Sequence, residues 1–349
     1  MNSTASTTTA TQIVLPGRVE PDELLVTRRE LPAPAAGQAL IRVEASGVSF
    51  AEQQMRRGKY YDQPAFPFVP GYDLVGEVTA VGSPEDTGLL GRRVAALTKT
   101  GGWASHALLD TADLVPVPDA LPADAAETFV VNGITAWQML HRIAKTAAGQ
   151  TILVHGANGG VGSTLVQLAL AAGIRVIGTA SAANADKVRA LGAIPVDYRG
   201  DVSAQVRAIA PEGVAAVFDH LGGQSAVDSF AMLAPGGTLV AYGSASTKDE
   251  EGNSRLPVLK LFARLALWNV LPNKRSAHFF NIWAGQRRPA RFRAQLAADL
   301  GAVLELAARG ELTPQIAARI PLSEAGRALA LAESHTVTGK VVLVADDAS

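Results

Sequence analysis

The chain has 349 residues and not one cysteine, which excludes disulfide bonds, thiol catalysis and cysteine-ligated zinc. Aromatic residues make up 5% of the chain and charged residues 18%, whereas hydrophobic residues reach 48%. This composition is typical of a globular chain that buries a large core, and the length is enough for two domains. The formal net charge is −1, so the composition gives no broad attraction to nucleic acid or to an acidic membrane.

Long apolar runs and targeting patterns are also absent from the sequence. The opening residues 1–12 (MNSTASTTTATQ) lack Lys and Arg, unlike a secretory signal or a transit peptide, and are interpreted as a disordered tail. The most apolar stretch, 256–271, is shorter than the ~20 residues of a spanning helix and is interrupted by Lys260 and Arg264. We therefore expect a cytoplasmic protein without membrane insertion.

Lys260 and Arg264 lie four residues apart and share one face of a helix. Residues 256–271 are therefore predicted to form an amphipathic helix on the surface or at a subunit contact. A lid over a substrate pocket, or a helix lying on a membrane surface, remains an alternative for this stretch.

The most informative motif is TILVHGANGGVG at 151–162, in which a run of β-formers leads into a glycine cluster and then a helical pattern. Such a turn presents backbone N–H groups and a helix N-terminus to a pyrophosphate. The frame GxGxxG falls on 157, 159 and 162, with alanine in its first place, and an ordinary turn is the alternative for a bare match. The candidate cofactor residues here are Gly156, Ala157, Asn158, Gly159, Gly160, Val161 and Gly162.

Short β-rich runs and helical patterns alternate after this turn, which predicts an α/β fold with a doubly wound parallel sheet. The expected strands are 151–154, 175–180, 194–198, 215–221, 238–242 and 277–283, and the expected helices between them are 185–191, 202–209 and 226–233. Ligands of such sheets bind beyond the carboxyl ends of the strands, where the strand order reverses.

The end of the second strand favours NADP over NAD. An NAD site usually has an acidic residue there for the ribose 2′-hydroxyl, whereas this chain has Thr179 and Ser181. Lys187 and Tyr198 are candidates to surround a 2′-phosphate, although a solvated lysine is the alternative. Asp186 is the first acidic residue after this strand. The alternative to a contact with the ribose is that it caps the N-terminal turn of the next helix.

The first 120 or so residues are predicted to be a β-rich, loop-rich domain. Alternating strands are expected at 39–44, 75–81, 93–97 and 104–109, and proline and glycine are dense between them. The pattern becomes helical near Ala123. Two further helices, 290–308 and 323–332, and a closing strand, 340–344, are expected at the C-terminus.

Several segments together resemble one known family. These are ASGVSFAEQQMRRGKYYDQPAFPFVPGYDLVGEVTAVG (45–82), NGITAW (132–137), HGANGGVG (155–162), LGAIPVDYRG (191–200) and TGKVVL (338–343). The chain is similar to the medium-chain dehydrogenase/reductase superfamily, in its zinc-independent NADPH:quinone oxidoreductase (zeta-crystallin-like) branch.

The resemblance implies a domain organisation and an activity. It implies a GroES-like catalytic domain over 13–127, a Rossmann NADP-binding domain over 128–284 and a return to the catalytic domain over 285–349. It also implies hydride transfer from NADPH to a quinone or to an activated C=C bond of an enone or enoyl substrate. A non-catalytic NADPH-binding protein of the same fold is the alternative, since the fold alone does not fix function.

The chain departs from its relatives at the metal site and the substrate site. Gly71-Tyr72-Asp73 stands where zinc alcohol dehydrogenases have Gly-His-Glu, and the six histidines are scattered, so no metal is expected. Ser49 and Glu52 stand where the quinone reductase branch often has Asn and Asp.

Without zinc, a phenol, a hydroxyl or water must hold the anion that develops on the substrate. Tyr60, which aligns with the Gly-x-Tyr of the family, is the first candidate for catalysis, followed by Ser49 and Glu52. A Tyr60 that merely covers the barrel surface is the alternative. Further cofactor contacts are expected from Asn132, Thr135, Leu221, Gly243, Ser244, Phe280, Asn281 and Lys340.

Two histidines and the sixth strand complete the expectations. His155 ends a strand and is interpreted as a buried, hydrogen-bonded residue. His220 follows Asp219, but neighbouring strand residues point to opposite faces, so we expect no acid–base pair. The apolar sixth strand at 277–283 offers a sheet edge, which together with the resemblance predicts a homodimer.

Overall fold

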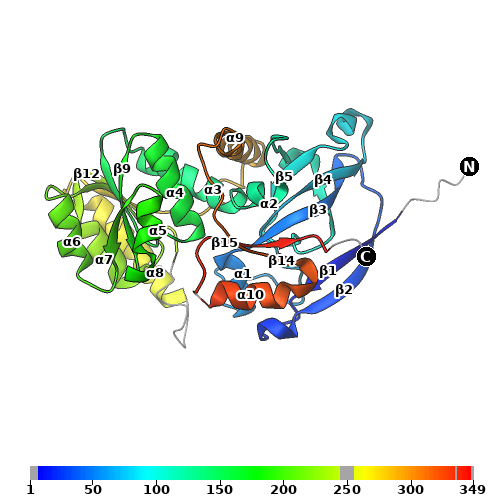
Figure 1. Cartoon of the computed structure of the whole chain (residues 1–349), viewed down its shortest axis with the longest axis horizontal. Coiled ribbons are helices and arrows are strands. Elements are labelled where there is room, and N and C mark those ends of the chain that lie inside the picture. Colours follow the sequence, from blue (N-terminus) through cyan, green and yellow to red (C-terminus); the bar gives the residue numbers. More distant parts are fainter. Residues whose placement is uncertain (1–6, 244–254, 335, 347–349) are drawn as a thin grey trace, which may run out of the picture. The chain divides into compact units, whose positions relative to one another are not determined.

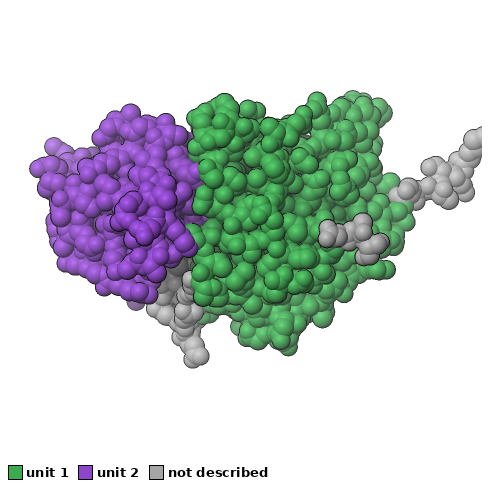
Figure 2. Space-filling model, in the orientation of Figure 1, with its two compact units in different colours: residues 1–131, 287–349 green, residues 132–286 purple. Residues whose placement is uncertain are grey.

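The computed structural model describes residues 7–243, 255–334 and 336–346. The chain forms two compact units (Figure 2). Unit 1 comprises residues 1–131 and 287–349, and unit 2 comprises residues 132–286. The division falls inside helix α3 (Val130–Trp137), near the expected bounds of 127/128 and 284/285.

Unit 2 is built on a six-stranded parallel sheet (Figure 1). Its strands are β8 (Thr151–Val154), β9 (Arg175–Ala180), β10 (Ile194–Asp197), β11 (Val214–Asp219), β12 (Leu233–Ala241) and β13 (Ser276–Phe279). Their spatial order is β10-β9-β8-β11-β12-β13, so the order reverses between β8 and β11. This is the strand order of a dinucleotide-binding fold, and it confirms the predicted fold class.

The helices of unit 2 follow the strands in the alternation that the sequence predicts. They are α4 (Gly160–Ala171), α5 (Ala185–Ala190), α6 (Val202–Ile209), α7 (Gly223–Ala231) and α8 (Arg255–Val270), with the short η5 (Ala182–Asn184) before α5. A π-helical segment, η4 (Gln138–Ala144), continues α3. Leu153, Ile177 and Val217 are fully buried at the centre of the sheet, because both of its faces are covered.

Unit 1 contains a seven-stranded sheet in which β15 (Lys340–Val344) brings the C-terminal segment back to β3 (Gln38–Val48). The path runs β14-β15-β3-β4-β5-β7, and β6 also pairs with β3. The other strands are β4 (Asp73–Val81), β5 (Arg93–Leu97), β6 (His106–Asp110), β7 (Val115–Pro116) and β14 (Ile316–Pro321). The family's expected return of the chain to its first domain is therefore present in the strand pairing.

Four α-helices and four 3₁₀ turns accompany this sheet in the described part of unit 1. The helices are α1 (Phe50–Arg56), α2 (Ala123–Glu127), α9 (Pro289–Ala308) and α10 (Ala325–Glu333), and the turns are η1 (Pro21–Glu23), η2 (Pro84–Leu89), η3 (Thr111–Asp113) and η7 (Leu322–Glu324). Arg56 at the end of α1 pairs with Glu333 at the end of α10, with Nη2 2.7 Å from Oε2.

The expectation of a disordered tail over 1–12 is wrong for its second half. Residues 8–14 form β1 (Thr8–Val14), which pairs antiparallel with β2 (Leu25–Leu31) along its whole length. Threonine-rich segments are polar, but threonine is β-branched and fits a pleated strand. Ala10 and Ile13, which belong to β1, are buried, so the strand pair has apolar side chains packed into the protein interior.

Several other strand and helix boundaries differ from the sequence-based expectations. The sixth strand ends at Phe279, so residues 280–283 follow it, and α7 begins at Gly223 rather than Ala226. Residues 245–254 of the long insertion lie outside the described residues. The amphipathic stretch is helical as α8, and among the helices that the structure describes none is long and apolar enough to cross a membrane.

Candidate functional site

The turn between β8 and α4 depends on two glycines. Gly156 has a φ of +64°, a conformation that side chains rarely adopt, and its carbonyl oxygen accepts the N–H of Gly159 at 2.9 Å. A Cβ on Gly162 would lie only 2.1 Å from that same carbonyl oxygen. The start of α4 can therefore pack against the end of β8 only because residue 162 has no side chain.

The N-terminus of α4 offers backbone donors to an anion. The first intrahelical bond joins Ser163 N to Gly159 O at 2.8 Å, so the N–H groups of Gly160, Val161 and Gly162 precede the helical ladder. Three such N–H groups and the helix dipole together favour bound negative charge. Asn158, another of the predicted cofactor residues, lies two residues before Gly160, the first of these donors.

Glycine at 159 and 160 has different causes. A Cβ on Gly159 would lie 3.3 Å from Gly156 O, which is tight but not a clash. Packing within the protein therefore does not by itself require glycine at this position. A Cβ on Gly160 would lie 2.7 Å from the amide nitrogen of Asn132, a buried residue of α3. The structure therefore brings Asn132 onto the glycine turn, as the sequence analysis expected of a cofactor contact.

Two of the predicted phosphate donors are used inside the protein. Gly156 N–H donates to Thr179 Oγ1 at 3.0 Å, and Ala157 N–H donates to the Thr179 carbonyl oxygen at 3.0 Å. Thr179 and Ala157 are both buried. Thr179 therefore anchors the turn to β9, and the N–H groups of Gly156 and Ala157 are already used within the protein.

A chain of hydrogen bonds runs from this anchor to a buried carboxylate. Ser229 Oγ donates to Asp219 Oδ2 at 2.8 Å, so the Ser229 oxygen accepts from Nε2 of His155 at 3.0 Å. His155 Nδ1 is then an acceptor, and it lies 3.4 Å from Thr179 Oγ1. Each donor in the chain therefore points from the glycine turn toward Asp219.

Asp219 closes this chain because its four acceptor positions are filled. Its Oδ1 accepts the N–H groups of Leu221 and Gly222 at 2.8 Å each, and Ser225 donates to Oδ2 at 2.7 Å. Burial lowers the pKa of His155, although the nearby Asp219 opposes the shift, so the imidazole is neutral. The expectation that His155 is buried and hydrogen-bonded is confirmed. The N–H of Leu221, a predicted cofactor residue, donates to Asp219.

The candidates for a 2′-phosphate lie at the ends of β9 and β10. Tyr198 N–H donates to Ala180 O at 3.1 Å, which brings Tyr198 beside Ser181. Lys187 is exposed on α5, and Asp186 next to it pairs with Arg189. The guanidinium of Arg199 lies 5.6 Å from the centre of the Tyr198 ring, a cation that the sequence analysis missed although it is the next residue.

The remaining candidates of unit 2 fall into three groups. Gly243 is required by packing, because a Cβ there would lie 2.6 Å from the His220 carbonyl oxygen. Thr135 and Phe280 are buried, and Asn281 follows β13 and accepts the N–H of Trp283 at 2.9 Å. Ser244 lies outside the described residues.

In unit 1, Ser49 and Glu52 form the N-terminal cap of α1. Ser49 Oγ accepts from Ala51 N at 3.1 Å, and Glu52 Oε2 accepts from Ser49 N at 2.9 Å. The other oxygen of Glu52 accepts from Tyr72 N at 2.6 Å, and the carboxyl is buried, which raises its pKa. Both residues therefore hold α1 and the segment before β4, and their catalytic role stays a prediction.

Tyr60, the first catalytic candidate, forms a hydroxyl pair with Tyr72. Their hydroxyl oxygens lie 2.7 Å apart, and the rings meet edge to face at 83°. Burial raises the pKa of Tyr60, and the neighbouring Tyr72 and Tyr61 raise it further, so its phenol stays protonated. The sequence analysis named Tyr72 only as a departure from Gly-His-Glu and missed it as a partner of Tyr60.

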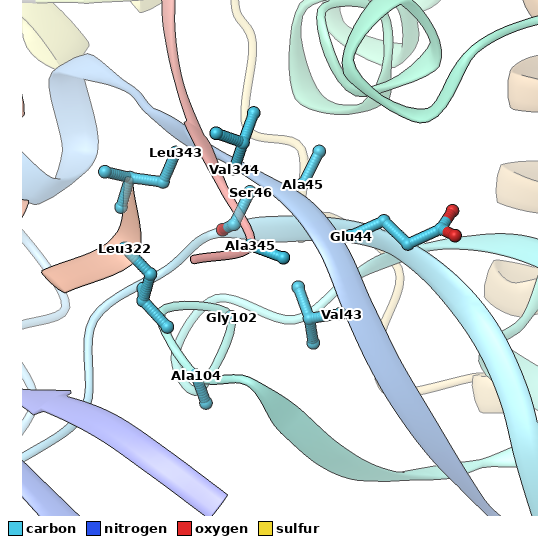
Figure 3. Close-up of a pocket in the computed structure, with 10 residues that line it drawn as sticks. All are labelled: Val43, Glu44, Ala45, Ser46, Gly102, Ala104, Leu322, Leu343, Val344 and Ala345. Carbon is cyan, nitrogen blue, oxygen red and sulfur yellow. The ribbon is translucent and has the colours of Figure 1, made fainter. Parts of the chain in front are cut away.

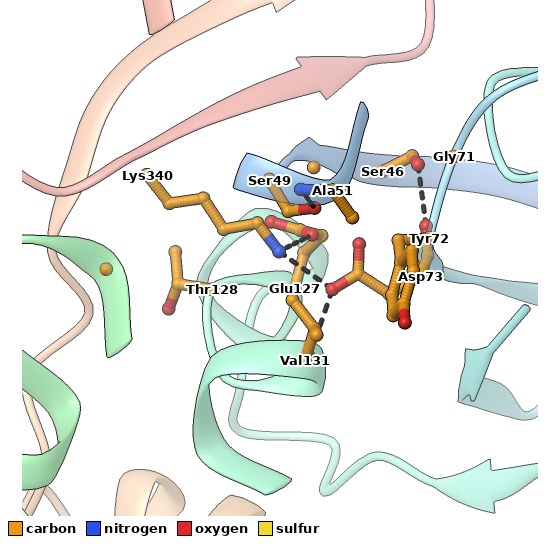
Figure 4. Close-up of polar contacts among 12 residues, drawn as sticks. Ser46, Ser49, Ala51, Gly71, Tyr72, Asp73, Glu127, Thr128, Val131 and Lys340 are labelled. Atoms are coloured by element: carbon orange, nitrogen blue, oxygen red, sulfur yellow. Dashed lines mark hydrogen bonds and ion pairs between the residues drawn. The ribbon is translucent and has the colours of Figure 1, made fainter. Parts of the chain in front are cut away.

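Lys340 lies in a buried ion cluster of unit 1, and its contact with the cofactor stays a prediction (Figure 4). Its Nζ is 2.7 Å from Asp73 Oδ2 and 2.6 Å from Glu127 Oε1. Asp73 Oδ2 also accepts from Val131 N at 3.0 Å, at the start of α3. The methylene chain of Lys340 crosses Gly47, where a Cβ would lie 2.0 Å from Cε.

The cluster contains two carboxyl groups and one ammonium, all buried. Burial raises the pKa of Glu127 well above its usual range, and the Asp73 carboxylate adds to the shift against the opposing effect of Lys340. Burial alone would lower the pKa of Lys340, but the two carboxyl groups raise it above its usual range. The Lys340 ammonium therefore stays charged between the two carboxyl groups.

The described residues do not fit a zinc site. Among them, no three His, Cys, Asp or Glu side chains gather where they could hold a metal ion. Unit 1 does contain a small pocket with about 190 Å³ of empty space (Figure 3). It is lined by Val43, Glu44, Ala45, Ser46, Gly102, Ala104, Leu322, Leu343, Val344 and Ala345, and none of these is a candidate residue.

Comparisons with known proteins agree with this geometry. Residues 35–119 match the alcohol dehydrogenase GroES-like domain, and residues 191–343 match the zinc-binding dehydrogenase family. The quinone oxidoreductase of Pongo abelii is 30% identical over 225 residues, which are 62% of this chain and 68% of that protein. The chain belongs to the quinone oxidoreductase branch of the medium-chain dehydrogenases/reductases.

Three other similar proteins differ in name and in how much of their length this chain covers. The VAT-1 homologue of Danio rerio, named a synaptic vesicle membrane protein, is 29% identical over 92% of this chain and 67% of that protein. The chain spans just 54% of the length of the rat homologue. A mycobacterial protein solved in complex with NADPH shares 27% identity at a TM-score of 0.80, with 96% of this chain and 99% of that one covered.

The directed hydrogen bonds predict the tautomer of His155. Histidine ¹⁵N NMR at about pH 6, just below the ordinary imidazole pKa, should show a neutral ring with its proton on Nε2. Because the folded state resists protonation, this residue makes the fold less stable as pH falls below about 6.5. A ring protonated at about pH 6, or one carrying its proton on Nδ1, would contradict the chain of bonds.

Proposed function

We propose that the protein binds NADPH and reduces a quinone or the activated C=C bond of an enone or enoyl substrate. The observation that carries the proposal is the N-terminus of α4, with the N–H groups of Gly160, Val161 and Gly162 at the point where the strand order reverses. The quinone oxidoreductase relatives and the NADPH complex of the mycobacterial protein support it.

The residues of unit 2 fit a dinucleotide with a 2′-phosphate. The three N–H groups would hold the pyrophosphate, and Asn132 and Thr135 would contact the nicotinamide portion. Lys187 and Arg199 are exposed cations in the segments that follow β9 and β10, and the carboxyl of Asp186 is paired with Arg189. A 2′-phosphate would therefore meet positive charge at this end of the sheet.

The nicotinamide supplies the hydride, and the protein must hold the oxygen of the substrate on which negative charge grows. Tyr60 is the residue suited to this task in unit 1. Its phenol stays protonated, and the more deeply buried Tyr72 lies at hydrogen-bond distance. If Tyr72 donates to Tyr60, the proton of Tyr60 is directed to the substrate oxygen.

Gly159→Ala and Gly162→Ala separate ligand binding from folding. Alanine at 159 fits the free protein at the cost of a few tenths of an ångström, but its methyl would lie where the phosphates approach. We expect unchanged thermal stability and about a hundredfold weaker NADPH binding by fluorescence titration, since charged hydrogen bonds contribute about 1.5–3 kcal/mol each. Alanine at 162 should instead lower the melting temperature of the free protein, because it clashes with Gly156 O. Equal NADPH affinity for Gly159→Ala and the wild type would contradict the placement of the pyrophosphate.

Lys187→Ala tests the choice between NADPH and NADH. The loss of a cation facing the 2′-phosphate should weaken NADPH by about 1–3 kcal/mol and leave NADH unchanged. Arg175→Ala, which removes an exposed cation from the opposite, N-terminal end of β9, is the matched control. An equal loss for both cofactors would show that Lys187 does not discriminate between them.

A panel of quinones and enones, followed by NADPH absorbance, tests the activity itself. We expect turnover that survives strong chelation, and a fall in kcat of about 10²–10³ for Tyr60→Phe, the loss typical of one oxyanion donor. The melting temperature of Tyr60→Phe is the control and should match that of the wild type. NADPH binding without turnover of any substrate would favour the non-catalytic alternative.

A further inference from the structure

His220 occupies the carboxyl end of β11, next to the glycine turn. A Cβ on Gly156 would lie 2.7 Å from His220 Cε1, so the imidazole lies directly against the backbone of that residue. A Cβ on Gly243 would lie 2.6 Å from the His220 carbonyl oxygen. The residue is thus held between the two glycines that follow the neighbouring strands β8 and β12.

The ring of His220 has one nitrogen in use and one in need of a donor. A hydrogen bond joins the ring to the backbone of His155. Its Nδ1 is buried, and no hydrogen-bond partner for it exists among the residues that the structure describes. The N–H of the ring is therefore on Nε2, and Nδ1 presents a lone pair.

Neutral histidine is the form that this site holds. Burial lowers the pKa of His220 to about 4, although Asp219 opposes the shift. A buried acceptor without a donor costs about 1–3 kcal/mol, and such atoms in native proteins commonly mark a site that a ligand or water completes. The nearest aromatic group is the ring of Tyr242, with its centre 5.9 Å from that of His220, and it offers no donor toward Nδ1 in the described structure.

The place of β11 in the sheet indicates which half of a dinucleotide would supply the donor. In a doubly wound fold, each half of the sheet binds one mononucleotide. Strands β8, β9 and β10 carry the glycine turn and the candidates for the 2′-phosphate, whereas β11 begins the other half. A hydroxyl near His220 therefore belongs to the nicotinamide side of the dinucleotide.

We propose that His220 is a cofactor-binding residue whose Nδ1 accepts a hydrogen bond from a ribose hydroxyl on the nicotinamide half of NADPH. This inference rests on the proposed function. It assigns a role to a histidine that the sequence analysis set aside, because that analysis weighed His220 only as a partner of Asp219. The role is binding and orientation, since an acceptor on the ribose fixes where the nicotinamide ring lies.

Two variants and two ligands test the proposal. His220→Ala should raise the Kd of NADPH about tenfold in a fluorescence titration, since it removes one hydrogen bond to a neutral acceptor. The Kd of 2′,5′-ADP, which lacks the nicotinamide half, should not change when it is measured by displacement of NADPH. His220→Asn should restore most of the affinity, because an amide oxygen can take the place of Nδ1. His278→Ala, on the exposed side of β13, is the matched control.

Histidine ¹⁵N NMR of the wild-type protein provides a readout that does not depend on activity. The Nδ1 resonance of His220 should move toward the hydrogen-bonded position on addition of NADP⁺ and stay in place on addition of 2′,5′-ADP. An unmoved Nδ1 signal, or equal NADPH affinity for His220→Ala and wild type, overturns the proposal while the proposed function stands. Failure of the wild type to bind NADPH at all overturns the proposed function instead.

Discussion

The close approach of β8 and α4 is the constraint on which the rest of unit 2 depends. A Cβ at position 162 would lie only 2.1 Å from the carbonyl oxygen of Gly156. Only glycine therefore lets the first turn of α4 pack this closely against that residue. That contact places the free N–H groups of the helix at the edge of the sheet where the strand order reverses. The bonds through Thr179, His155 and Ser229 to Asp219 then hold the turn in place from beneath, so the donors for a phosphate are fixed before any ligand arrives.

In unit 1 one short segment, Gly71-Tyr72-Asp73, links two polar groups. Tyr72 contributes its hydroxyl to Tyr60 and its N–H to Glu52, while Asp73 pairs with Lys340. Zinc dehydrogenases have Gly-His-Glu at this segment, and here its side chains are engaged with phenols and an ammonium. Gly71-Tyr72-Asp73 thus joins the phenol pair to the buried ion cluster.

Local patterns predicted the fold well, and long-range contacts explain what they missed. Strands 175–180 and 340–344 and helix 202–209 have the expected bounds, because their apolar periodicity and flanking glycines are local signals. Strand β1 was missed because its partner β2 supplies the pairing and its threonines look merely polar. The ion pair of Lys340 was missed because Asp73 lies 267 residues earlier in the chain, a contact that no spacing rule reveals. The N-terminal cap of α1 could have been predicted from the sequence, because Ser49 and Glu52 have the S-x-x-E spacing of a capping box.

The central claim is that the N–H groups of Gly160, Val161 and Gly162 bind the paired phosphates of a dinucleotide. Backbone amide NMR of the protein, with and without NADPH, tests it most directly. The account predicts that these three amide protons move downfield and become protected from exchange when NADPH is added, as expected for hydrogen bonds to phosphate oxygens. Amides of the α4 N-terminus that keep their shifts and exchange rates at saturating NADPH would contradict it.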